Sequence, residues 1–388
     1  MSKLWRVSLG LAILAGAVAD ARAIPAFARK YQMSCTTCHA PFPRLKAFGE
    51  EFAARGFRMD DPSKEPARAV IDTGDPLLRL TREFPVAARL DGFAAWKQDA
   101  AAETDFEWPW SAKVLSGGPI GEKTSYYVYA ILEKGESVKL EDVWVQFNRI
   151  WNWPVDLQVG QFQVCDPIFK RELRLEREDY RIFGTQVGDA VVDLTYDRGL
   201  YVIGHAPRSV DLMLAVVNGN GIDAASEDDD FDRDNFKNVA LRVAAPVGPV
   251  RLGLFGYWGR ERGAGDLVNE TTYLGPDLVA AFGPKVQLNV EYLERRDDDP
   301  FFVGNVGEDV KTRGGFVEVH VLPGGEDGRQ AWSLLYNNVD SDDPGATSET
   351  ASVTFTWLVV RNLKMVVEAG RDLDADRTKA SVGIVTAF

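Results

Sequence analysis

The last ten residues of the chain, 379-KASVGIVTAF-388, decide which fold the sequence specifies. Val382, Ile384 and Phe388 fall on one face of a segment with a period of two, and the intervening residues fall on the other. A period of two is typical of a β-strand whose two faces meet different surroundings. The chain therefore ends in a strand, and the question is how many more precede it.

The same alternation recurs upstream. Polar and apolar residues alternate in 286-VQLNVEY-292, and in 106-FEWPWSAKV-114 the period of two places Phe106, Trp108 and Trp110 on one face. Sixteen strands are predicted, an even number. They are 84–97, 106–115, 124–134, 140–149, 154–163, 197–205, 210–217, 236–246, 250–259, 271–282, 285–294, 313–322, 329–338, 349–360, 363–370 and 379–388.

The connections between these strands fall into two alternating sets. One set is short, as at 361–362, whereas the other includes 164–196, 218–235 and 295–312 and carries most of the acidic runs. Tight turns at one end and long loops at the other are typical of outer-membrane barrels, and a soluble sandwich lacks this two-sidedness. The sequence predicts an all-β fold, a 16-stranded antiparallel porin-like barrel formed by residues 84–388.

The first residues predict export. Residues 1–23 have a positive start at Lys3 and Arg6, an apolar stretch over 7–19 that is too short to span a bilayer, and an Ala-x-Ala site ending at Ala23. We interpret them as a signal peptide; the alternative is an N-terminal membrane anchor. With an even number of strands, both ends of the barrel are expected on the periplasmic side of the outer membrane.

A second motif precedes the barrel. Cys35, Cys38 and His39 form C-x-x-C-H, the spacing at which two thiols bond to the vinyl groups of one haem while the imidazole reaches the iron. A chance match, a redox pair and half a zinc site are the alternatives; the chain offers neither further zinc ligands at a suitable spacing nor a thioredoxin-like pattern. We predict one covalent haem c with His39 as its proximal axial ligand.

The haem segment, residues 24–83, is too short to enclose a haem with a core of its own. Its one clear helix follows Pro43 and ends near Gly56. We expect the barrel wall to complete the pocket, so that the segment plugs the periplasmic mouth.

The distal iron ligand is open. Met59 follows His39 by twenty residues and is one candidate, with core filling as its alternative, whereas Met33 lies too close to the motif to reach across the ring. His320 is the other candidate because its strand pattern points it into the lumen near the same end; its alternative is an ordinary lumen histidine. His205 lies near that end with a less clear facing.

The net charge of −14 disfavours nucleic-acid binding. Acidic external loops would concentrate a cation at the mouth, bind the divalent cations that bridge lipopolysaccharide, or simply be solvated. The loop 164–196 contains KRELRLEREDYR, which either folds into the pore and narrows it or forms a solvated helix. Cys165 remains as a single thiol. We find no hydrolytic triad, phosphate-binding Gly loop or dinucleotide fingerprint.

The stretch 30-KYQMSCTTCHAPFPRLKAFGEEFAARGF-57 resembles the fused cytochrome–porins of the bacterial outer membrane, which include the iron-oxidising outer-membrane cytochrome c. The matching positions are Cys35, Cys38, His39, Pro43, Leu45, Phe48, Gly49, Phe52, Gly56 and Phe57. The resemblance implies a conduit in which an extracellular donor such as Fe(II) passes an electron through the haem to a periplasmic cytochrome c. If the protein is an enzyme, it is then an Fe(II):cytochrome c oxidoreductase.

Three other functions stay open at this stage. The first is a diffusion porin with a haem-bearing plug or redox gate. The second is a conduit that carries electrons outward. The third is a soluble periplasmic cytochrome to which the β domain belongs.

Overall fold

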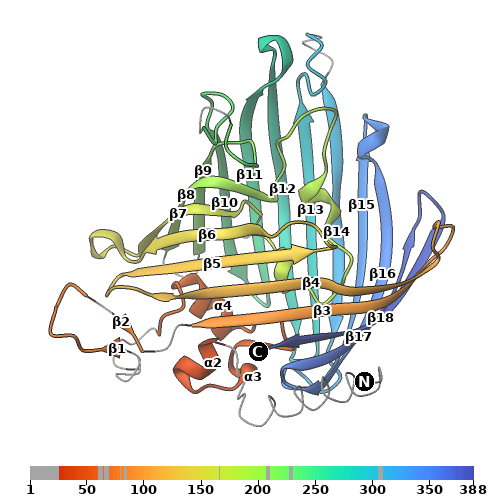
Figure 1. Cartoon of the computed structure of the whole chain (residues 1–388). Coiled ribbons are helices and arrows are strands. Elements are labelled where there is room, and N and C mark those ends of the chain that lie inside the picture. The colour runs from red at the N-terminus through yellow and green to blue at the C-terminus, as the bar shows by residue number, and fades with distance from the viewer. Residues whose placement is uncertain are drawn as a thin grey trace, which may run out of the picture.

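The structure is a computed structural model that describes residues 26–388 except 60–63, 65–69, 79, 83–84, 166, 207–209, 227–229 and 305–308. The predicted signal peptide lies outside the described residues. A barrel dominates the molecule, and three short helices lie at one of its ends, beside the C-terminus (Figure 1). We call this end the near mouth and the opposite end the far mouth.

The barrel is antiparallel and closed, because β18 pairs with β3. Each predicted strand overlaps one observed barrel strand, so the predicted fold is confirmed. The barrel strands are β3 (Val86–Lys97), β4 (Thr104–Pro119), β5 (Thr124–Glu133), β6 (Lys139–Phe147), β7 (Val155–Gln163), β8 (Tyr196–Ala206), β9 (Val210–Val217), β10 (Asn238–Val247), β11 (Val250–Arg262), β12 (Val268–Phe282), β13 (Val286–Asp297), β14 (Val310–Val321), β15 (Gln330–Ser341), β16 (Ser348–Val360), β17 (Leu363–Asp372) and β18 (Arg377–Ala387).

The strands turn an apolar face outward. In β15, Trp332 is 43% exposed on the outside, whereas its neighbour Ser333 is 1% exposed inside. The terminal strand behaves as predicted, with Val382 and Ile384 outside and Val385 buried. An outward apolar face is stable only against lipid, so this is a membrane-spanning barrel.

Among the residues that the structure describes, no helix has the length and apolar character needed to cross a membrane.

One predicted facing is wrong. Trp110 was expected on the same face as Trp108, yet it lines the interior with Phe93. The pairing of β3 with β4 shifts between Asp91 and Phe93, and extra residues of β4 bulge out there. Ser111 and Glu107, on either side of the bulge, both face inward, so the alternation breaks only at the bulged residues, of which Trp110 is one.

The N-terminal segment, residues 26–59, forms α2 (Ala26–Tyr31), α3 (Cys35–Cys38) and α4 (Ala47–Ala54). The predicted helix after Pro43 corresponds to α4. Gly49 lets α3 and α4 approach closely, because a Cβ there would lie 2.4 Å from the Cys38 carbonyl oxygen. A small hairpin of β1 (Val70–Ile71) and β2 (Leu80–Thr81) lies between this segment and β3.

The N-terminal segment is tied to several strands at the near mouth. Arg29 donates to the Val86 carbonyl at 2.6 Å, Gln146 to the Ala54 carbonyl at 2.8 Å, and Lys364 to the Phe42 carbonyl at 3.1 Å. Arg44 also bonds to Gln287. Because these partners lie on β3, β6, β13 and β17, the segment is held from several sides of the mouth.

The loop 164–195, between β7 and β8, folds into the lumen from the far mouth. It contains the 3₁₀ turns η4 (Arg171–Leu173) and η5 (Arg181–Gly184). Ile182 and Phe183 have no exposed surface, and the Tyr180 ring stacks on Phe316 with 4.0 Å between the centroids. Of the two interpretations of this loop, a fold into the pore is confirmed and a solvated helix is wrong.

Candidate functional site

The C-x-x-C-H motif occupies one turn of helix and the residue after it. Ser34 caps α3 by accepting from Thr36 N at 3.3 Å, and His39 N donates to the Cys35 carbonyl at 2.9 Å. One tight turn thus brings the two thiols and the imidazole to the wall of a single cavity. Neither Cys35 nor Cys38 forms a disulfide.

The His39 ring is fixed in orientation and tautomer. Its Nδ1 lies 3.0 Å from the Pro43 carbonyl oxygen, which can only accept, so Nδ1 carries the proton and Nε2 keeps its lone pair. Burial lowers the pKa of His39 and outweighs the backbone hydrogen bonds that oppose it. The side chain is therefore neutral near pH 7, which is the form that binds a metal.

Burial also raises the pKa of the Cys35 and Cys38 thiols. Both are protonated at neutral pH. A structural metal site would require both thiols to lose their protons on binding.

The cavity beside the motif has a volume of about 400 Å³, within the roughly 300–1,000 Å³ of small-molecule sites. It lies between the N-terminal segment and the barrel wall, and the loop 164–195 closes its inner side. The N-terminal segment contributes Met33, Phe42, Leu45, Phe52 and Phe57; the wall contributes Leu115, Tyr127, Trp144, Phe162, Tyr201 and Met213; the loop contributes Pro167, Lys170, Glu172 and Leu173. Aromatic rings face it from both sides, so it is a largely apolar site, and cationic side chains such as Lys170 and Arg89 also line it.

The structure sorts the methionine candidates. Met33 lines this cavity, whereas Met59 is not among the described residues that line it. Met213 of β9 also lines it, which the sequence analysis missed because nothing local in a strand marks a thioether that faces a distant motif. The side chain of His205 lies outside what the structure describes.

His320 points into the lumen as predicted, but it does not join His39. Among the described residues it is not part of the cavity lining. Its Nε2 lies 3.0 Å from a Glu318 oxygen and its Nδ1 lies 2.8 Å from Ser333 Oγ. Because both nitrogens are engaged on the barrel wall, the geometry does not support His320 as a distal axial ligand.

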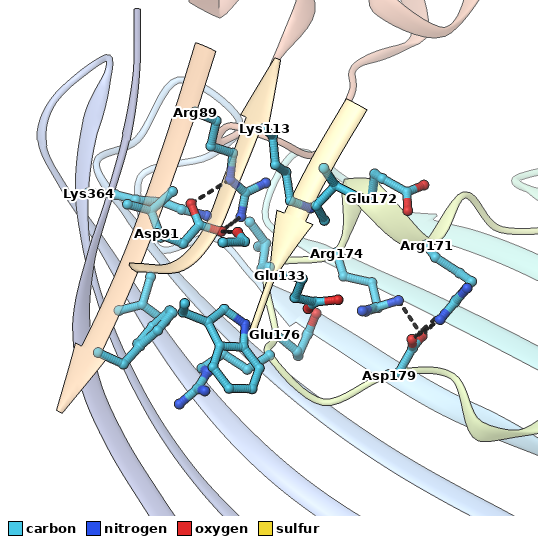
Figure 2. A pocket seen from close by; sticks show the side chains of 18 of the residues that line it. Arg89, Asp91, Lys113, Glu133, Arg171, Glu172, Arg174, Glu176, Asp179 and Lys364 are labelled. Carbon is cyan, nitrogen blue, oxygen red and sulfur yellow. Dashed lines mark hydrogen bonds and ion pairs between the residues drawn. The ribbon is translucent and has the colours of Figure 1, made fainter. Parts of the chain in front are cut away.

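A second, smaller gap of about 110 Å³ separates the loop from strands β3 to β6 and β17 (Figure 2). Figure 2 shows Arg89 against Asp91 on the wall, at 2.6 Å, and Arg171 and Arg174 converging on Asp179 of the loop. Asp179 is held ionised because Arg174 and Arg171 outweigh its burial and lower its pKa to about 2.

Other charges complete this gap. Arg177 pairs with Glu107 at 2.6 Å and lies over the Trp110 ring, 4.3 Å from its centroid. Burial, and then the neighbouring Glu318, raise the pKa of Glu176 to about 7. The remaining space in the lumen is therefore narrow and lined by charge.

No protein-family model and no curated protein sequence matches the chain. Among solved structures, the chain is similar to an anion-selective porin from Comamonas acidovorans, with a TM-score of 0.58 and 12% identity over 79% of this chain and 99% of that porin.

A loop-deletion form of the outer-membrane protein OmpT of Vibrio cholerae has a TM-score of 0.56 at 10% identity, over 79% of this chain and 99% of OmpT. Salmonella typhi OmpF, in complex with daunomycin, has a TM-score of 0.55 at 11% identity, over 80% of this chain and 98% of OmpF. At such identities the likeness concerns the fold. The chain therefore has the porin-type barrel, with a motif-bearing segment in its near mouth.

Proposed function

We propose that this protein is an outer-membrane electron conduit with one haem c, a member of the fused cytochrome–porins. Electrons pass between an extracellular donor, Fe(II), and a periplasmic cytochrome c. One observation carries the proposal: Cys35, Cys38 and His39 all line a single, largely apolar cavity between the N-terminal segment and the barrel wall.

The residues around the cavity fit a haem. Phe42, Phe52 and Trp144 provide apolar surface for a flat macrocycle, and the two thiols would hold it covalently. His39 presents Nε2 because Pro43 occupies Nδ1. Cationic groups suited to the propionates, Arg89, Lys113, Lys170 and Arg361, also line the cavity. When bound there, the haem supplies a one-electron redox centre.

The rest of the chain insulates this centre. The loop 164–195 fills its side of the lumen with an apolar core that includes Ile182, Phe183 and Leu194. The N-terminal segment occupies the near mouth. Together they narrow the pore to a charged gap of about 110 Å³, which would restrict the passage of solutes more than that of electrons. Such insulation keeps a poorly soluble oxidation product such as Fe(III) outside the cell.

The barrel surface and the ends of the barrel support a location in the outer membrane. An apolar exterior suits the lipid and lipopolysaccharide of the outer membrane. The N-terminal segment would face a periplasmic cytochrome c if both ends of the barrel are periplasmic. Acidic runs on the connections after β9 and β13, such as 230-DFDRD-234, would attract a cation at the far mouth.

The test is reduction of the haem by its proposed donor. Purified protein is oxidised, ferrous iron is added without oxygen, and the haem absorbance is recorded, with dithionite defining full reduction. We expect reduction by Fe(II) in the wild type. A haem that dithionite reduces and Fe(II) does not would exclude Fe(II) as donor and favour another donor or outward flow. A protein without haem would overturn the proposal.

A diffusion porin is the second candidate, and the porin-type fold together with the charge-lined gap of about 110 Å³ favours it. Liposomes loaded with both a reducible dye and a small fluorescent solute separate the two functions. Dye reduction without solute leakage supports the conduit, whereas leakage supports the porin or a redox-gated pore.

A further inference from the structure

Three ligand-type side chains meet on the lumen side of β14, away from the cavity. Glu318 and His320 lie on the inward face of that strand, and Glu176 reaches them from the loop 164–195. Their donor atoms all lie within 4.8 Å of one another, with 3.0 Å between His320 Nε2 and Glu318 Oε2 and 4.0 Å between His320 Nδ1 and Glu176 Oε1.

Glu176 is the unusual member of this cluster. Its side chain has no exposed surface, and neither of its oxygens makes a hydrogen bond of normal geometry within the described residues. The neighbouring Ser333 hydroxyl is bonded to His320. Glu318, in contrast, accepts from Tyr180 at 2.9 Å and from Asn289 at 2.5 Å. A buried carboxylate that has only long contacts with His320 and Ser333 costs free energy, so a further partner is expected.

Charge balance indicates the chemical nature of this further partner of Glu176. With both carboxyl groups ionised, Glu176 and Glu318 carry an excess of negative charge even when the His320 imidazole is protonated. A divalent cation with two carboxylates and a neutral imidazole gives a neutral group. The 3.0 Å between His320 Nε2 and Glu318 Oε2 is near the separation of two neighbouring ligands on one metal ion, and an oxygen of Glu176 lies within 4.8 Å of the ligand atoms of both residues.

We propose that Glu176, Glu318 and His320 bind a divalent first-row transition-metal cation in the lumen. One imidazole with two carboxylates suits Fe(II), Zn(II) or Co(II), whereas Ca²⁺ and Mg²⁺ prefer all-oxygen sites. Glu176 also lines the charged gap, so the cluster borders a space through which a cation would enter. The bound cation would fasten the loop 164–195 to the barrel wall.

The site neighbours the N-terminal segment. Gln287, the cross-strand partner of His320, accepts a hydrogen bond from Arg44. A cation held here would lie beside the segment that carries the C-x-x-C-H motif. The binding itself needs no haem, so failure of this proposal would leave the haem proposal standing.

The test uses Zn(II), which is redox-inert and cannot reduce a haem. The full-length purified protein is titrated with Zn(II) by calorimetry in a large excess of Mg²⁺, which occupies non-specific acidic sites. We expect one tight site per chain, and we expect Glu176→Gln and His320→Asn each to weaken it at least about tenfold. X-ray absorption at the zinc edge should show one imidazole in the wild type and none in His320→Asn.

Glu291→Gln is the matched control. Glu291 is likewise buried on the inner wall with both oxygens unpartnered in the described structure, but it belongs to no cluster with a histidine. This variant should bind Zn(II) as the wild type does. Heat-dependent migration on gels checks that each barrel is folded, and haem content is read separately. Wild-type protein without a tight site, or equal affinities for Glu176→Gln and Glu291→Gln, would overturn the proposal.

Discussion

Residues 26–59 and the loop 164–195 both occupy the inside of the barrel, yet they fill it differently. The loop packs an apolar core against one side of the wall, where Ile182, Phe183 and Leu194 lose all exposure, and it leaves a charged gap of only about 110 Å³ on the other side. The N-terminal segment leaves about 400 Å³ open between itself and the wall. Protein interiors are normally close-packed, so an apolar cavity of this size is typical of a ligand-binding site, whereas the core of the loop is filled by its own side chains.

The largest expected effect is the loss of covalent haem when the C-x-x-C-H motif of the N-terminal segment is changed. Replacing Cys35 and Cys38 together by Ser removes both proposed attachment points, and we expect complete loss of covalent haem. The segment, left around an empty cavity, should also become more sensitive to protease. A haem stain after denaturing electrophoresis measures the first effect and limited proteolysis the second.

Cys165→Ser is the matched control. Cys165 is buried with the loop core and does not line the cavity among the described residues. This variant should keep its haem. Covalent haem that survives in the double variant would show that the proposed attachment is wrong. The cavity beside the N-terminal segment would then have no explanation as a haem site.

The second prediction concerns the loop. Phe183→Ala removes a fully buried ring, which typically costs about 3–5 kcal/mol. We expect the loop to detach from the wall while the hydrogen-bonded barrel stays folded. Single-channel conductance in planar bilayers should therefore rise. Phe231→Ala, on the connection after β9, removes a half-exposed ring and should leave conductance unchanged; a similar increase in both variants would contradict the dry packing of the loop.

A smaller effect is expected where α3 meets α4. In Gly49→Ala the new Cβ would lie 2.4 Å from the Cys38 carbonyl oxygen, so the two helices must separate. Such overpacking typically costs about 1–3 kcal/mol. We expect a lower haem content per chain. Gly121→Ala, in a turn of the same mouth, meets no atom closer than 3.6 Å and should retain the wild-type haem content. Equal haem in both variants would argue against a motif held by close helix packing.

Much of this architecture could be predicted because lipid and water act on opposite faces of each strand. That contrast requires apolar and polar residues to alternate along each strand, and all sixteen barrel strands could be predicted from this period of two. The motif was recognisable because Cys35, Cys38 and His39 are adjacent and their chemistry depends on spacing alone. The helix α4 was visible through its apolar repeat and the glycine that ends it.

Other features arise only when distant segments meet. The bulge that turns Trp110 inward depends on the pairing of β3 with β4. Met213 faces the cavity because β9 lies opposite the N-terminal segment, and Glu176 reaches His320 from a loop on the other side of the lumen. No local pattern encodes these contacts, so sequence reasoning could place His320 in the lumen but could not name its neighbours there.

The smallest expected change in conductance comes from the ion pairs of Asp179 in the loop 164–195. Asp179 receives Arg171 Nε at 3.1 Å and also pairs with Arg174. Asp179→Asn leaves two guanidinium groups without their carboxylate. Because these side chains are only partly buried, the cost should be about 1–2 kcal/mol, between that of exposed and buried ion pairs. Conductance should rise less than in Phe183→Ala, since the aromatic core stays in place.

The pH dependence of this attachment has a definite sign. The pKa of Asp179 is about 2, below its ordinary value, so its ion pairs are complete at neutral pH and at pH 5. They are lost only as the pH falls from about 4 towards 2. Wild-type conductance should therefore be constant above that window and increase within it, whereas Asp179→Asn should begin at the higher value and lack this step. A step in wild-type conductance centred near pH 6 would contradict this prediction. It would show that titratable groups other than Asp179 hold the loop against the wall.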